Sequence, residues 1–208
     1  MTSSEKFGKD YFMDSKVSNY RNYREKKFDN LADDLIEFLP LRPTDTVLDI
    51  GCATGGLMFA LKCKGISLIK GMDHSLWAVS EGRQMFGFNN NDLQYYSLNL
   101  LNDNKDWVLI LDVLEHMPNG ELERVLKLLS DYPPSKGVVV RIPVSKSEGM
   151  DFALEVSQND KTHVQIHDKT WWANKLGSFG FEEVRRIEMQ SIYDSEGVFC
   201  AVFKKVQK

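Results

Sequence analysis

The sequence contains little cysteine, and the cysteines that are present form no recognisable pattern. Cys52, Cys63 and Cys200 have neither the CxxC spacing of a metal site nor the even number of a disulfide framework. An odd set of thiols is typical of a reducing compartment, so we expect a cytoplasmic protein without structural disulfides.

Long apolar runs and an excess of positive charge are also missing. No stretch of the sequence is long and apolar enough to span a bilayer, and the first residues, MTSSEKFGKD, lack the apolar core of a secretory signal. The net charge is -4, and no basic stripe suited to a phosphate backbone is visible. We therefore expect a small-molecule partner, and neither a nucleic acid nor a membrane.

The sequence does show a regular alternation of strand and helix patterns. Apolar strand-like segments occur at 45–51, 67–73, 93–100, 107–114 and 137–143, and two more follow at 182–190 and 197–206. Helical periodicity fills the intervals, and the expected N-caps are Ser75, Asn119 and Asp168. This order predicts an α/β fold: a doubly wound, Rossmann-like, seven-stranded sheet, mostly parallel, with an antiparallel C-terminal hairpin.

A glycine-rich turn follows the first predicted strand, in the stretch DTVLDIGCATGG. Glycines at this place allow the backbone to approach a ligand closely, because ligands of such sheets bind at the carboxyl ends of the strands. Gly51, Ala53 and Gly56 approximate the GxGxxG pattern of dinucleotide sites. Asp49 argues against an anionic pyrophosphate, because a carboxylate beside the loop suits a ligand that carries an ammonium or sulfonium group.

Polar residues follow the next predicted strands as well. Asp73 lies about twenty residues beyond the glycine loop, the distance at which an acid accepts hydrogen bonds from ribose hydroxyls. Asn99 ends the third predicted strand and could meet an adenine amino group or form a turn. Asp112, Glu115 and His116 lie at the carboxyl end of the fourth, within LDVLEHMP.

Together VLDIGCATGG, GMDHS and DWVLILDVLEHMP resemble the class I S-adenosylmethionine-dependent methyltransferases. The similarity runs from about Thr46 to Phe203 and includes the terminal hairpin. It implies that residues 41–208 form a methyltransferase domain that binds S-adenosyl-L-methionine, within a chain that is a single domain overall. Residues 1–40 would form an N-terminal lid or helical segment.

The resemblance also implies which residues contact the cofactor. The loop from Asp49 to Gly55 would hold the methionine portion, Asp73 the ribose, Asn99 and Leu100 the adenine, and Asp112 and Val113 would border the pocket. The expected contacts are Asp49, Gly51, Cys52, Ala53, Gly55, Asp73, His74, Asn99, Leu100, Asp112 and Val113. Ala53 and Asn99 depart from the commoner glycine and aspartate of the family.

Methyl transfer to a hydroxyl benefits from a base, and histidines supply the candidates. We expect His116 and His163 to be catalytic, with Glu115 and Asp160 as orienting groups, and His167 to be structural. Glu115 and His116 with a downstream histidine also resemble the metal-binding arrangement of some O-methyltransferases, in which a divalent ion lowers the pKa of a hydroxyl. The downstream spacing does not decide this, and we expect a metal-free site.

Three functions fit the sequence. The expected one is an S-adenosylmethionine-dependent methyltransferase that acts on a small molecule, on oxygen. The alternatives are a non-catalytic S-adenosylmethionine-binding partner subunit and an NAD-dependent oxidoreductase, the latter supported only by the imperfect glycine pattern.

Overall fold

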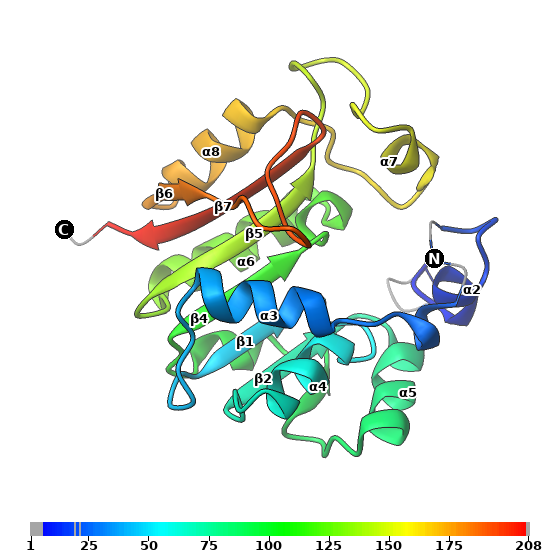
Figure 1. Ribbon diagram of the computed structural model, residues 1–208. Helices are drawn as coiled ribbons and strands as arrows, with labels where there is room; N and C mark the ends of the chain where they lie inside the picture. Colours follow the sequence, from blue (N-terminus) through cyan, green and yellow to red (C-terminus); the bar gives the residue numbers. More distant parts are fainter. Residues whose placement is uncertain (1–5, 19, 21, 207–208) are drawn as a thin grey trace. The chain divides into compact units, whose positions relative to one another are not determined.

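The computed structural model describes residues 6–18, 20 and 22–206 (Figure 1). The chain forms two compact units, residues 1–97 and 98–208. Each unit contains its own strands and helices, so the two are described in turn.

The first unit contains three parallel strands in the order β3-β2-β1. They are β1 (Val47–Ile50), β2 (Ile69–Asp73) and β3 (Leu93–Tyr95). All four residues of β1 are buried, Asp49 included. Among its described residues, the helices of this unit are α2 (Lys9–Met13), the 3-10 turn η1 (Tyr23–Glu25), α3 (Asp29–Phe38), α4 (Gly56–Cys63) and α5 (Leu76–Phe86).

Local signals set the ends of α5. The backbone N–H of Ala78 donates to the Ser75 hydroxyl at 3.0 Å, which confirms Ser75 as the N-cap. Gly87 ends the helix in the left-handed conformation, with φ of 70°. In α3 the apolar residues Ala32 and Leu35 are buried.

The third predicted strand was too long. Only Leu93–Tyr95 pairs with β2, and the 3-10 helix η2 (Leu98–Asn102) follows in the second unit. Leu100 and Leu101 are buried in this turn. Asn99 and Leu100 therefore do not end a strand: the run lacks β-branched residues, and its apolar side chains are buried by a helical turn instead.

The second unit contains four strands in the order β4-β5-β7-β6. β4 (Trp107–Leu111) and β5 (Gly137–Pro143) are parallel, and β7 (Val198–Lys205) is antiparallel to both β5 and β6 (Phe181–Arg186). The antiparallel hairpin expected at the C-terminus is thus present. The remaining elements are the 3-10 turn η3 (Leu114–His116), α6 (Asn119–Asp131), α7 (Glu155–Asn159) and α8 (Lys169–Ser178).

The two expected caps in this unit differ in outcome. Asp168 accepts from the backbone N–H of Trp171 at 2.8 Å and caps α8 as predicted. Asn119 does not cap α6, because Pro118 occupies the N-cap position and Asn119 is the first helical residue. The side-chain oxygen of Asn119 instead accepts from Gln165 Nε2 at 2.7 Å.

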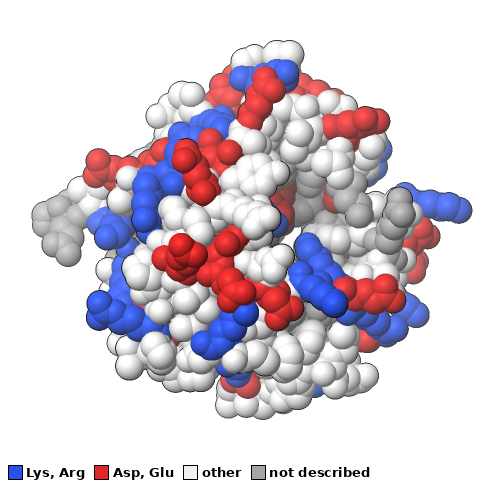
Figure 2. All heavy atoms as spheres, in the orientation of Figure 1, with Lys and Arg blue, Asp and Glu red and all other residues white. Residues whose placement is uncertain are grey.

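The strands and helices confirm the predicted α/β, Rossmann-like class, mostly parallel with an antiparallel hairpin. Across the part of the chain that the structure describes, no helix combines the length and hydropathy needed to cross a bilayer. On the face drawn in Figure 2, acidic and basic side chains are interspersed.

Candidate functional site

The glycine loop after β1 adopts a backbone that favours glycine at three positions. Gly51, Ala53 and Gly55 have φ values of 74°, 51° and 76°. At Gly55 a Cβ would also lie 2.8 Å from the ring of Phe88, so this position requires glycine twice over. Ala53 adopts the left-handed conformation despite its methyl group, which typically costs about 1–2 kcal/mol. The conformation of the loop therefore depends on glycine at Gly51 and Gly55.

Asp73, at the end of β2, holds this loop. One carboxylate oxygen accepts from the backbone N–H of Ala53 at 2.7 Å, and the other accepts from that of Ser75 at 2.7 Å. Burial raises the pKa of Asp73, although the two backbone hydrogen bonds and His74 oppose the shift. Asp73, the predicted ribose-binding acid, therefore stabilises the loop. Each of its oxygens still has a lone pair that can accept a further hydrogen bond.

Asp49 lies in the middle of β1 and is buried. Burial, and to a smaller extent the charge of Asp73, raises the pKa of Asp49 to about 8. A buried carboxylate is favoured in its charged form when a cation lies nearby. Asp49 therefore suits a cationic ligand, the property that the sequence suggested.

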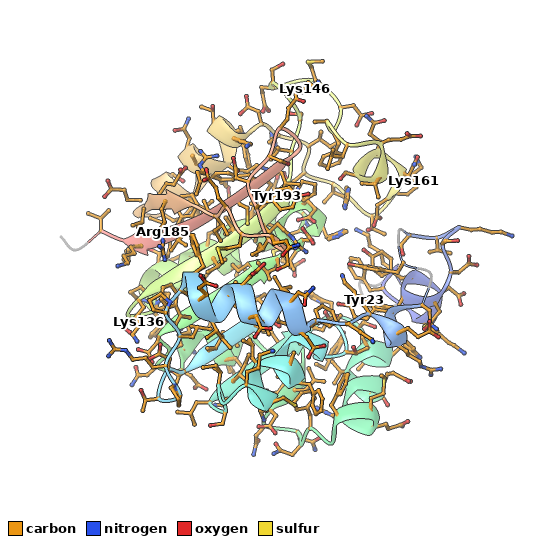
Figure 3. The ribbon with its side chains drawn as sticks, viewed as in Figure 1. Tyr23, Lys136, Lys146, Lys161, Arg185 and Tyr193 are labelled. Carbon is orange, nitrogen blue, oxygen red and sulfur yellow. The ribbon has the colours of Figure 1, made fainter. Side chains whose placement is uncertain are left out.

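Aromatic residues from the N-terminal segment pack against the glycine loop. Tyr11, Phe12 and Tyr23 form one buried cluster with Ala53 of the loop and Ala78 of α5. Burial raises the pKa of the Tyr23 phenol well above its usual value, and the nearby charges of Tyr20, Asp49 and Asp73 act in the same direction. Tyr23 is labelled in Figure 3, between α2 and α3.

His74 follows Asp73 and stacks on Tyr96. The two rings lie 3.6 Å apart between centroids with an interplanar angle of 23°. Tyr96 follows β3, and its backbone N–H donates to the Asp73 carbonyl at 2.8 Å. Sequence reasoning missed Tyr96, because nothing in YYS indicates which tyrosine faces His74.

The predicted cofactor residues of the second unit lie in two places. Asn99 and Leu100 are in η2, and Asp112 and Val113 follow β4. Asp112 has φ of 58°, and its carboxylate accepts from Arg141 Nε of β5 at 2.9 Å. Arg141 was not predicted, because its place opposite Leu111, next to Asp112, depends on how β4 and β5 pair.

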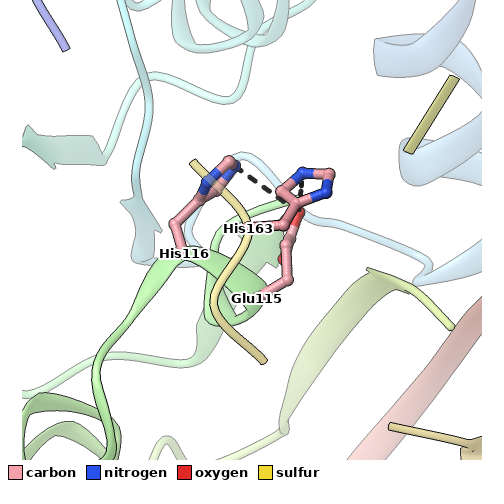
Figure 4. A group of neighbouring side chains, drawn as sticks. All are labelled: Glu115, His116 and His163. Atoms are coloured by element: carbon pink, nitrogen blue, oxygen red, sulfur yellow. Dashed lines mark ion pairs between the residues drawn. The ribbon is translucent and has the colours of Figure 1, made fainter. Parts of the chain in front are cut away.

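The second unit also brings together Glu115, His116 and His163 (Figure 4). Glu115 and His116 belong to η3, whereas His163 comes from the loop between α7 and α8. Oε1 of Glu115 lies 3.7 Å from Nε2 of His116 and 4.0 Å from Nε2 of His163. The Glu115 side chain is fully buried, and the two imidazoles are 12% and 7% exposed.

Hydrogen bonds to Nδ1 determine the orientation of both rings. His163 Nδ1 lies 2.8 Å from the Ser157 carbonyl, which can only accept, so this nitrogen carries a proton. His116 Nδ1 lies 2.9 Å from Thr162 Oγ1, and that hydroxyl donates its own proton to Asp160 at 2.5 Å. Thr162 therefore accepts from His116, and in its neutral form either ring presents the Nε2 lone pair on the side of Glu115.

The two acids of this region have opposite pKa shifts. Burial raises the pKa of Glu115 well above its ordinary value, and the charge of Asp112 adds to this. Burial alone would raise the pKa of Asp160 as well, but hydrogen bonds from the Thr162 side chain and backbone, with both imidazoles, lower it overall. Asp160 is therefore the ionised partner of the histidines.

Backbone bonds anchor the loop that carries His163. The N–H groups of Val164 and Gln165 donate to the Glu115 carbonyl at 2.8 and 3.0 Å. The side chain of Gln165 donates to the Met117 carbonyl at 2.9 Å. His167 lies apart from the cluster and stacks on Trp171 at 3.5 Å, as expected of a structural residue.

Sequence reasoning missed Ser157 and Thr162, which orient the rings. The Thr162 backbone N–H and hydroxyl both bond Asp160 Oδ1, at 2.9 and 2.5 Å. An aspartate followed two residues later by threonine, as in DKT, is the local signal for such a turn. Ser157 acts through its carbonyl, so its side chain gives no signal.

A family model described as a methyltransferase domain matches residues 21–185. The chain belongs to this family. Membership confirms the predicted resemblance, and with it the cofactor, S-adenosylmethionine. The protein is therefore an S-adenosylmethionine-dependent methyltransferase by family. A search of the curated proteins finds no match.

Solved structures share the fold. The PH0226 protein of Pyrococcus horikoshii OT3 has a TM-score of 0.66 at 16% identity, covering 94% of this chain and 98% of that one. The methyltransferase domain of bacterial CtHen1-C has a TM-score of 0.61 at 19% identity, covering 85% and 97%. Magnesium protoporphyrin IX methyltransferase of Synechocystis PCC 6803, solved with bound SAM, has 0.56 at 20%, covering 86% and 79%.

Proposed function

We propose that this protein transfers the methyl group of S-adenosylmethionine to a hydroxyl of a small molecule. The observation that carries the proposal is the pair of imidazoles, His116 and His163, which lie together with little solvent exposure and with Nδ1 of each hydrogen-bonded. When bound, the cofactor supplies an activated sulfonium methyl, so the protein needs to bind, align and deprotonate the acceptor.

The first unit supports the cofactor part of this proposal. The left-handed glycine loop allows close backbone approach, and buried Asp49 favours a ligand that is partly cationic. Asp73 retains acceptor capacity for ribose hydroxyls, and the His74 ring is held by Tyr96. The proposed contacts are those predicted from sequence: Asp49, Gly51, Cys52, Ala53, Gly55, Asp73, His74, Asn99, Leu100, Asp112 and Val113.

The second unit supports acceptor chemistry on oxygen. An amine acceptor that is already neutral needs no base, whereas a hydroxyl gains from one. Nε2 of either His116 or His163 can accept the hydroxyl proton, because Nδ1 of each ring already carries one. Ionised Asp160 would stabilise the imidazolium that forms, with its Oδ2 3.9 Å from His163 Nε2.

The surface supports a small acceptor. The sequence carries 26 Lys and Arg against 30 Asp and Glu, and both signs are interspersed on the face in Figure 2. Affinity for a nucleic-acid backbone depends on clustered positive charge. A steep loss of RNA or DNA binding with added salt would contradict this part of the proposal.

Two measurements test the function. Calorimetry should show binding of S-adenosylmethionine and S-adenosylhomocysteine but not of NAD. Labelled methyl transfer to a panel of hydroxylated metabolites should then give a product. Binding without transfer to any acceptor, in a panel that also includes amines, would favour a non-catalytic cofactor-binding subunit.

The imidazoles are tested by His163→Ala. We expect turnover to fall by about 10²–10⁴-fold, the usual contribution of a general base, with cofactor affinity nearly unchanged. His167→Gln is the matched control, because His167 lies outside the cluster. Full turnover in both His116→Ala and His163→Ala would mean that alignment alone suffices.

A further inference from the structure

Glu115 is the least satisfied acid that the structure describes. Its side chain is fully buried, and neither carboxylate oxygen has a hydrogen-bond partner among the described residues. A buried carboxylate without hydrogen bonds is strongly unfavourable, and proteins retain such groups when a cation is bound beside them. The surroundings of Glu115 therefore call for a positive charge.

Nε2 of His116 and Nε2 of His163 both lie near Oε1 of Glu115. Because Nδ1 of His116 and of His163 is the donor in each ring, Nε2 is the nitrogen that faces Glu115. Two nitrogen lone pairs and a carboxylate oxygen repel one another unless a proton or a metal ion lies between them. The separations of 3.7 and 4.0 Å are too long for direct hydrogen bonds.

We propose that Glu115, His116 and His163 bind a divalent transition-metal ion. The three donor atoms lie within 4.8 Å of one another. Two ligands of one ion, each about 2.0–2.2 Å from it, can be at most about 4.4 Å apart. Both distances to Glu115 meet this limit, and a shift of a few tenths of an ångström brings the whole set within it.

The groups behind the histidines match those behind known metal ligands. A metal-binding histidine usually donates its other N–H to a carbonyl or a carboxylate, which fixes the ring. His163 donates to the Ser157 carbonyl. His116 donates to the Thr162 hydroxyl, which in turn donates to Asp160. Asp160 with Glu115 would supply two negative charges, which balance a divalent ion.

The donor set indicates the class of ion. Two imidazoles and one carboxylate suit Zn²⁺, Fe²⁺, Mn²⁺ or Co²⁺, whereas Mg²⁺ and Ca²⁺ prefer oxygen ligands alone. Three protein ligands leave at least one position open. An acceptor hydroxyl bound there would lose its proton to water more readily, because the ion lowers its pKa. This role rests on the proposed function, and it would replace direct proton transfer to the imidazoles.

Metal binding is measured on the full chain after treatment with a chelator. Co²⁺ titration should give a visible absorption band that saturates at one ion per chain, and Zn²⁺ should displace Co²⁺. Glu115→Gln, His116→Ala and His163→Ala should each weaken binding by more than the 10–100-fold typical of an outer partner. Thr162→Val should fall within that 10–100-fold range, because it removes the partner of His116 and one hydrogen bond to Asp160 but no proposed metal ligand.

His167→Gln is the control, because it removes a histidine from the same loop without touching the cluster. It should bind Co²⁺ as the native chain does. Absence of a saturable site in the native chain, or equal binding by Glu115→Gln, would overturn the proposal and leave the imidazoles as bases.

Cofactor binding separates this proposal from the function itself. Calorimetry with S-adenosylhomocysteine on the metal-free chain should show unchanged affinity, and the same measurement shows that each variant is folded. A chain that binds the cofactor but no metal retains the proposed function and loses only this inference. A chain that binds metal but no cofactor loses the proposed function instead.

Discussion

Asp73 is the last residue of β2 in the first unit, and Glu115 follows β4 in the second. Both are buried acids, yet their surroundings are opposite. Each oxygen of Asp73 accepts a backbone N–H at 2.7 Å, whereas neither oxygen of Glu115 accepts any bond from the described residues. Asp73 is satisfied by the fold itself. Glu115 has no such partner among the described residues, and the proposed metal site would supply one.

The largest expected effect comes from replacing Asp73, the acid whose oxygens are both hydrogen-bonded. Asp73→Ala leaves the N–H groups of Ala53 and Ser75 without their acceptor, and each lost bond costs about 1–3 kcal/mol. We expect the free energy of unfolding to fall by about 3 kcal/mol in denaturant titrations, and cofactor affinity to weaken by about 1–3 kcal/mol. Asp73→Asn, which keeps one acceptor, should lose less. Unchanged cofactor affinity in Asp73→Ala would remove the ribose assignment.

The same kind of change at Glu115 should have the opposite sign. In the metal-free chain, Glu115→Gln removes no hydrogen bond, and the amide has no charged form, so the variant loses the cost of burying a group whose pKa is raised by burial. We expect the free energy of unfolding to rise by about 1–3 kcal/mol, the usual cost of such a group. Thermal unfolding in the presence of chelator measures this. Destabilisation instead would mean that Glu115 has a structural partner, as Asp73 has.

The smallest effect concerns Asp49, whose pKa burial raises to about 8. Because the pKa of Asp49 is raised in the folded state, the unfolded chain loses this proton at lower pH than the folded chain does. The free energy of unfolding therefore falls as pH rises from about 4 to about 8. A cationic ligand lowers this pKa in the complex, so binding should release part of a proton at pH 7. Affinity should increase with pH by at most about tenfold per unit up to pH 8.

Calorimetry of cofactor binding in two buffers with different protonation enthalpies measures the proton released. Asp49→Asn is the control, because it preserves shape and cannot titrate. Equal proton release by native chain and variant would show that Asp49 does not sense the cofactor's charge.

Much of the fold followed from local pattern. Ser75 and Asp168 cap α5 and α8 because a short polar side chain before a helix can reach its free N–H groups. The buried strands β1, β4 and β5 are apolar runs of a length typical of strands. The prediction failed where context competed with pattern: Leu98–Asn102 became a helical turn, and Pro118 took the cap expected of Asn119.

The sequence by itself determined the family and the cofactor class, because these depend on motifs that are local in the chain. It also offered Glu115, His116 and His163 as candidates, and the structure brings these three side chains together. Only the tertiary structure decided what the histidines can do. Their Nδ1 partners come from Thr162 and the Ser157 carbonyl, and their shared target is Glu115. The proton on an imidazole is placed by whichever acceptor lies beside it, and folding brings that acceptor from a distant segment.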